Sequence, residues 1–133
     1  MGMYTELLIS ARIKNDPIAV DAIKAMLGED NPSKLPEHKL FLTPRWKHML
    51  VCSSYYFVPL SIHKFEYNTI GRYWVLISRS DFKNYDNEID LFIDWIKPYL
   101  DTSNGEMYGY YRYEESSEPT ILYTGGKPSN DYF

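Results

Sequence analysis

Cysteine is almost absent from this sequence, in which Cys52 is the only one among 133 residues. An intramolecular disulfide is therefore impossible, and the stability of the fold must come from its core. Long apolar runs are missing too, since charged or polar residues interrupt each one well before the roughly 20 residues of a membrane span. The first residues, MGMYTELLISARIK, do not follow the basic, apolar and small pattern of a signal peptide. These absences predict a cytoplasmic protein with no membrane partner.

Histidine is scarce as well, and the patterns of metal sites and enzymes are missing. His38, His48 and His63 lie in no H-x-x-x-H, H-E-x-x-H or C-x-x-C pattern, so we predict no metal and no cofactor. The segment 52–54 (CSS) lies in a predicted strand rather than on the glycine-flanked turn that exposes a nucleophile. The sequence therefore predicts no catalytic residues and no enzyme. A pair of Cys52 with a histidine on a neighbouring strand is the enzymatic alternative.

Positive charge is not in surplus, because the net charge is −4 at pH 7. This balance argues against nucleic acid as a partner, since contacts with phosphates need an excess of Lys and Arg. The charge is also uneven along the chain, with +3 over residues 1–80 and −7 over residues 81–118. A solvated helix face is one explanation of the acidic segment. A surface that meets a basic partner, or that imitates nucleic acid, is the other.

Apolar residues make up 44% of the chain and recur with two different periods. Helical spacing predicts helices over residues 17–27 and 87–100, the first capped by Asp16 and the second by Asp86 or Asn87. Alternation and apolar runs between turn residues predict strands; their expected ranges are 4–13, 48–58, 61–67, 73–80, 107–115 and 120–124. The proline-containing segment 29–47 is expected to form a long loop, and a polar tail is expected from about residue 125.

The predicted order is β-α-β-β-β-α-β-β, which indicates the α+β class. Short connections permit only antiparallel neighbours over residues 48–80. Each helix has one apolar stripe and needs a sheet face to cover. We therefore predict a single domain over residues 1–133. Its expected form is a two-layer sandwich in which both helices lie on one face of a mostly antiparallel sheet of about six strands.

Aromatic residues are abundant: there are 13 tyrosines, 6 phenylalanines and 3 tryptophans. Tyrosine suits half-wet protein interfaces, although strands also favour it for structural reasons. We expect binding on the sheet face away from the helices and on the loop around Trp46. The candidate binding residues are Arg12, Arg45, Trp46, Tyr56, Arg79, Tyr110 and Arg112, and Tyr108 is expected to share the open face with Tyr110.

Two functions fit this pattern. The first is a non-catalytic interaction protein that docks a partner through Tyr and Arg side chains. The alternative is a protein that binds a small ligand, such as a nucleotide-like or other flat polar molecule, which could lie at the interface of a homodimer. The sequence does not decide between them.

Three stretches, SSYYF, KNYDNEIDLFIDWIKPYL and YEESSEPTILY, resemble recurring blocks of uncharacterised small proteins from bacteriophages and prophages. The resemblance covers most of the chain, but the blocks carry no catalytic motif. It implies a protein that acts in the cytoplasm of a bacterial host. It also implies that the partner is a bacterial protein, which the chain would bind and inhibit, such as a component of an anti-phage defence system.

Overall fold

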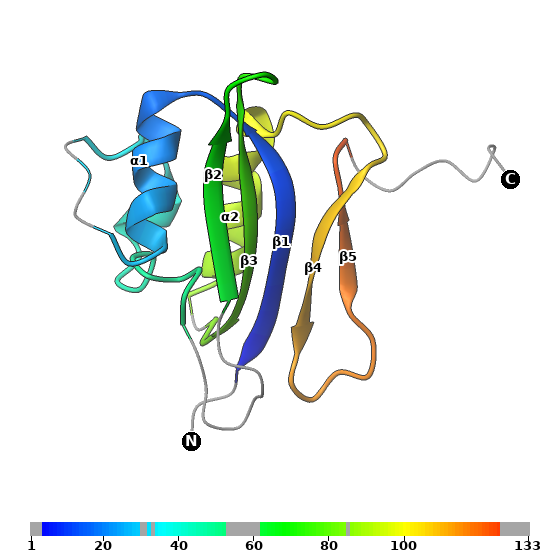
Figure 1. The fold of residues 1–133 in the computed structure, drawn as a ribbon. Helices are drawn as coiled ribbons and strands as arrows, with labels where there is room; N and C mark the ends of the chain where they lie inside the picture. The colour runs from blue at the N-terminus through cyan, green and yellow to red at the C-terminus, as the bar shows by residue number, and fades with distance from the viewer. Residues whose placement is uncertain (1–3, 30–31, 33, 53–61, 85, 126–133) are drawn as a thin grey trace, which may run out of the picture.

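The computed structural model describes residues 4–29, 32, 34–52, 62–84 and 86–125 (Figure 1). Within these residues the chain forms a five-stranded antiparallel sheet and two α-helices, which confirms the predicted α+β class. The strands are β1 (Thr5–Lys14), β2 (Ile62–Asn68), β3 (Tyr73–Phe82), β4 (Met107–Tyr113) and β5 (Thr120–Tyr123). The helices are α1 (Pro17–Met26) and α2 (Glu88–Ile96), with the short 3-10 helices η1 (Lys39–Leu42) and η2 (Lys97–Tyr99).

The first strand, β1, lies in the middle of the sheet, whose order is β2-β3-β1-β4-β5. It pairs with β3 along its whole length and with β4 only over Thr5–Ile9. Leu7, Ile9, Ala11 and Ile13 are buried, and the residues that alternate with them, Leu8, Ser10 and Arg12, point to the opposite face. This alternation follows from the two-residue period of a strand.

Both helices pack on the buried face of the sheet, as predicted. Side chains of β1, α1 and α2 belong to one apolar cluster, to which α1 contributes Ile23 and Met26 and α2 contributes Phe92 and Ile96. Figure 1 views the molecule from the opposite, open side of the sheet, so that α2 runs behind β2 and β3. Among the described residues, no helix is long and apolar enough to cross a membrane.

The start of α1 is as predicted, and the start of α2 is not. The Oδ1 atom of Asp16 accepts hydrogen bonds from the amides of Ile18 and Ala19 at 3.1 and 3.0 Å. In α2, Asn87 has a left-handed backbone (φ 56°) and its side chain forms no capping bond. Instead, Asn84 Oδ1 accepts a hydrogen bond from the Ile89 amide at 2.9 Å. The side chain that caps α2 thus comes from further upstream than the sequence suggested.

The strand predicted at residues 48–58 is wrong over 48–52, where the chain forms turns. His48 has a φ of 65°, and Met49 and Leu50 are both fully buried, so the one-in, one-out pattern of a strand is absent. The amides of His48 and Leu50 donate to carbonyls at the end of α1 at 3.3 and 3.1 Å. The segment is therefore tied to the end of α1 and, through the Cys52 carbonyl, which accepts a hydrogen bond from the Asp81 amide at 3.0 Å, to one residue of β3 without forming a strand. Residues 53–58 of this prediction, and the tail from 126, lie outside the described residues.

Candidate functional site

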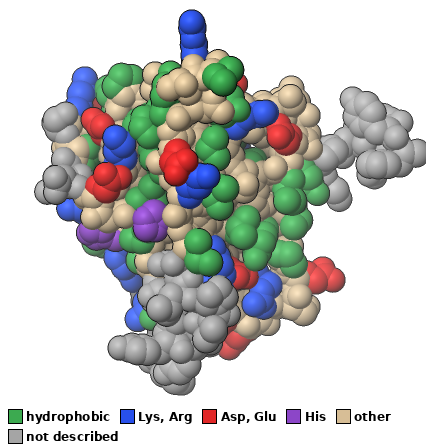
Figure 2. Space-filling view, in the orientation of Figure 1, with side chains coloured by type: hydrophobic (Ala, Val, Ile, Leu, Met, Phe, Trp, Pro, Cys, Tyr) green, Lys and Arg blue, Asp and Glu red, His purple; other side chains and the backbone are tan. Residues whose placement is uncertain are grey.

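The open face of the sheet, opposite the helices, carries the even-numbered residues of β1 and their cross-strand neighbours. The register places Ile62, Arg79, Leu8, Tyr110 and Ile121 side by side, in a row that crosses all five strands. We call these five residues the central row. Four of the five are apolar or aromatic. Figure 2 shows this face, with apolar side chains exposed between groups of basic and acidic ones.

A second row lies directly beside the central row and consists of charged residues. Glu6 on β1 is flanked by Asp81 on β3 and by Arg112 on β4. Arg79 reaches over from the central row: its Nη2 and Nε lie 2.8 and 2.9 Å from Glu6 Oε2, and its Nη1 donates to Asp81 Oδ2 at 3.3 Å. Arg112 Nε lies 3.8 Å from Glu6 Oε1. Two arginines thus compensate two carboxylates, and we call these four residues the ionic cluster.

The ionic cluster is partly withdrawn from water. Asp81 is fully buried, and the side chains of Glu6 and Arg79 are only 12% and 14% exposed. Burial raises the pKa of Asp81, and Arg79 opposes that rise. The pKa of Tyr110 is raised mainly by burial and also by the nearby Glu6 carboxylate. These groups fix one another in place, and the charges of the two arginines are already matched.

Arg12 lies on the same open face but further along β1. Its Nε donates to the Asp101 carbonyl at 2.9 Å, and its Nη2 lies 3.3 Å from Glu106 Oε2. Its guanidinium also lies over the ring of Tyr73, 5.7 Å from the centroid. Four of the predicted binding residues therefore share one face: Arg12, Arg79, Tyr110 and Arg112.

Arg45 and Trp46, which were predicted to form a second binding surface on the loop, lie in the helix layer. Arg45 Nη2 is 3.1 Å from Asp86 Oδ2, and Arg45 Nε is 3.5 Å from the buried Glu88 carboxylate. Trp46 is half-buried and meets Phe41 edge-on, with ring centroids 4.9 Å apart. The loop thus covers part of the core. The seventh candidate, Tyr56, lies outside the described residues.

Comparison with protein-family models, with curated proteins and with solved structures found no match for this chain. The resemblance to small phage and prophage proteins therefore stays a prediction. The properties of the candidate site are those of its own residues.

Three of the four acidic residues in and just before α2 are paired within the chain. Asp86 and Glu88 face Arg45, and Asp94 Oδ2 lies 2.7 Å from His38 Nε2. That hydrogen bond is the main reason why the pKa of Asp94 is lowered. A basic partner would have to displace these contacts, which makes α2 a weaker candidate for recognition than the open face.

Cys52 shows no sign of activation. Its Sγ lies 3.2 Å from the His48 carbonyl oxygen, and burial raises the pKa of the thiol, which disfavours the reactive thiolate. Among the described residues, no group of three or more His, Cys, Asp or Glu side chains could hold a metal ion.

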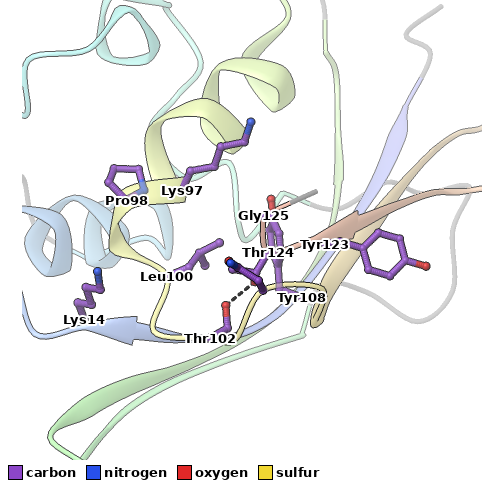
Figure 3. Close-up of a pocket in the computed structure, with 10 residues that line it drawn as sticks. Lys14, Lys97, Pro98, Leu100, Thr102, Tyr108, Tyr123, Thr124 and Gly125 are labelled. Carbon is purple, nitrogen blue, oxygen red and sulfur yellow. Dashed lines mark hydrogen bonds between the residues drawn. The ribbon is translucent and has the colours of Figure 1, made fainter. Parts of the chain in front are cut away.

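A pocket lies at the end of the sheet where α2 terminates (Figure 3). It has a volume of about 650 Å³. Its position follows from β4, which pairs with β1 only as far as Ile9. Beyond that point Leu100 forms a bridge to Ile13, and the Asp101 amide donates to the Arg12 carbonyl at 2.8 Å. We call it the end pocket; its lining residues include Lys14, Lys97, Leu100, Thr102, Tyr108 and Thr124.

Sequence reasoning missed two sets of residues. The apolar members of the central row, such as Leu8 and Ile62, were overlooked because an apolar residue gives no sign of which face it occupies until the strand register is known. The end pocket was missed because its lining comes from β1, η2, β4 and β5, which are far apart in the chain. Only the alternation of β1, which placed Glu6 and Arg12 outward, gave a usable signal.

Proposed function

We propose that this chain is a non-catalytic binding protein that docks a partner protein on the open face of its sheet. The observation that carries this proposal is the pair of adjacent rows, one mainly apolar and one ionic with its charges matched. Protein interfaces have an apolar centre with a polar rim and are enriched in Tyr and Arg. Ile62 and Ile77, which are 55% and 41% exposed, supply accessible apolar surface on this face.

The charge pairing supports a protein rather than nucleic acid as the partner. Nucleic acid needs cations that are available to phosphates, whereas Arg79 and Arg112 face Glu6 and Arg12 faces Glu106. A protein surface of mixed, nearly neutral character complements this face best. The resemblance to phage proteins extends the proposal to a bacterial partner that is inhibited by stoichiometric binding, with an anti-phage defence component as the specific class.

Capture of a partner protein from bacterial lysate, repeated with variants of this chain, tests the docking face. Ile77→Asp and Tyr110→Ala should each weaken binding of a protein captured from bacterial lysate, because truncation at a hot spot costs about 2 kcal/mol or roughly 30-fold in affinity. Ile70→Asp is the matched control, since Ile70 is 95% exposed in the turn between β2 and β3. All variants should fold as the parent does, by circular dichroism.

The proposal is tested by comparing the affinities of the parent and the three variants for the captured partner. A partner that binds the parent and Ile70→Asp equally, and both open-face variants at least about tenfold more weakly, supports the proposal. A stoichiometric partner that binds all four proteins with the same affinity would place the interface elsewhere. In that event, charge reversal on α2, at Asp90, is the next test.

A further inference from the structure

The two edges of the sheet are built differently, and only one of them is suited to pairing with a further strand. At one edge, β5 has four residues and follows the register shift in β4. At the other edge, β2 has seven residues and pairs with β3 in unbroken register from Ile62 to Asn68 (Figure 1). It contains no proline, glycine or bulge. Proteins use such interruptions to keep sheet edges from pairing with one another, so β2 is the edge that can accept a partner strand.

The side chains of β2 are accessible on both faces of the sheet, and five of its seven residues are exposed. Lys64 and Glu66 lie on the open face, where their side chains are 54% and 69% exposed. On the helix side, His63 is exposed and Tyr67 is 39% exposed. The helix layer therefore does not enclose this edge. Among the described residues, β2 pairs with no strand other than β3.

The helix side of β2 carries aromatic rings that a partner strand would cover. Phe65 is stacked on Trp74 of β3, with ring centroids 4.6 Å apart, and the ring of Tyr67 lies 5.4 Å from that of Trp74. Phe65 is nevertheless only half-buried. Aromatic residues that lie opposite each other on paired strands stabilise a sheet. Pairing at this edge would thus bury more of a row of rings that is already packed.

The sequence of β2 is complementary to itself. In a two-fold symmetric antiparallel pair, one residue lies at the centre of both strands, and residues at equal distances on either side of it lie opposite each other. The middle residue of β2 is Phe65. Pairing over the full length of the strand therefore places Phe65 opposite Phe65. It also places Lys64 of each copy opposite Glu66 of the other.

Charge disfavours the neighbouring symmetric registers. A pair centred on Lys64 would place two lysines directly opposite each other, and a pair centred on Glu66 would do the same with two glutamates. Opposite charges across two strands stabilise a sheet, and like charges destabilise it. Within one chain, Lys64 Nζ lies 3.5 Å from Glu66 Oε2, so in the register centred on Phe65 two such ion pairs meet as four alternating charges. Length of overlap and charge therefore select the same register.

We propose that this chain forms a symmetric homodimer in which β2 pairs antiparallel with β2 of a second copy, centred on Phe65. The two five-stranded sheets then form one continuous sheet. The two-fold axis is perpendicular to that sheet, because only this axis relates two antiparallel strands that lie side by side. The open faces of both copies therefore lie on the same side of the dimer. This pairing requires no other protein, so it does not rest on the proposed docking function.

Analytical ultracentrifugation of the purified full chain at low salt tests the dimer. The parent should be mainly dimeric at about 100 μM. Lys64→Glu and Glu66→Lys each place like charges opposite one another twice, so each should raise the dissociation constant at least about tenfold. Asp90→Lys, on the exposed surface of α2, makes the same change in net charge as Glu66→Lys and should leave the dissociation constant unchanged. Circular dichroism should show that all variants fold as the parent does.

Mixing the two β2 variants tests the register. Each supplies the charge that the other lacks, so a 1:1 mixture of Lys64→Glu and Glu66→Lys should form a mixed dimer with about the affinity of the parent. The double variant Lys64→Glu/Glu66→Lys should also dimerise as the parent does. A parent that stays mainly monomeric at about 100 μM overturns the proposal and would leave β2 to the strand of a different protein. Dimers of equal affinity in the parent and both single variants would overturn it too. Because only purified chain is used, the result is independent of whether a docking partner is captured from lysate.

Discussion

At the scale of single residues, two aspartates show how surroundings set the role of a carboxylate. Asp81 is buried beside Arg79 in the ionic cluster, and burial raises its pKa. Asp94 is exposed on α2, and its pKa is lowered, chiefly by the hydrogen bond to His38. The two shifts have opposite signs. The two residues should therefore contribute to stability in opposite ways as the pH falls.

Asp81→Asn tests this at the ionic cluster. A folded-state pKa above the unfolded value of about 4 means that the stabilising contribution of Asp81 is fully present below that value. It is lost as the pH rises through the folded pKa. The parent should therefore gain stability relative to Asp81→Asn as the pH falls from about 7 to about 4. Urea denaturation of both proteins across this range measures the difference.

Asp94→Asn is the matched control, for which the change in stability with pH should have the opposite sign. The advantage of the parent over this variant should be present at neutral pH and should shrink on acidification, because a lowered pKa stabilises the fold only while the carboxylate is ionised. If both variants change in the same direction relative to the parent, the contrast between the buried and the exposed aspartate is wrong.

At the scale of elements, the bulge in β4 shapes both candidate sites. The register shifts between Met107 and Gly109, and the backbone of Gly109 lies so close to β1 that an added Cβ would be 2.0 Å from the Leu8 carbonyl oxygen. Bulges bend a strand and redirect its side chains. Here Tyr108 turns into the core side of the sheet, while Tyr110 stays on the open face.

Gly109→Ala should therefore destabilise the fold strongly. The clash is with backbone, which cannot move aside as a flexible side chain can, so we expect a loss of about 3 kcal/mol in the free energy of unfolding. Gly71→Ala is the control, because the three atoms nearest to its added Cβ belong to the ring of Tyr73, the closest at 2.1 Å. A side chain can rotate aside, so this change should cost less than about 1 kcal/mol. Chemical denaturation measures both, and equal losses would contradict the assigned role of Gly109.

The same bulge explains why part of the candidate site could not be predicted. Simple alternation along residues 107–115 put Tyr108 and Tyr110 on one face, and a single bulged residue reverses that relation. The alternation of β1 contains no bulge, so Glu6 and Arg12 were placed correctly. Segment 48–52 failed for a different reason: its apolar residues resemble a buried strand, and only the contacts with the end of α1 show otherwise.

At the scale of the whole molecule, the layer arrangement followed from periodicity, but the order of the strands did not. One apolar stripe on each helix required a common sheet face, which the structure has. The central position of β1 depends on pairings between residues about 70 and 105 positions apart, and no local pattern reports them. The central row exists only because of that strand order. The sequence could therefore indicate the open side of the sheet as the docking face, but it could not predict which residues of that face lie side by side across the strands.

The unequal pairing of β1 has a consequence for the dynamics of the molecule. The chain holds β1 to β3 over Thr5–Lys14 but to β4 only over Thr5–Ile9, so the β1–β4 seam is the weaker of the two. Local opening follows such differences, because amide protons exchange through the least costly partial unfolding. In native-state hydrogen exchange, the amides of β4 and β5 should lose protection in a sub-global opening while those of β1 and β3 persist to global unfolding. Uniform protection across all five strands would show that the sheet opens as one unit.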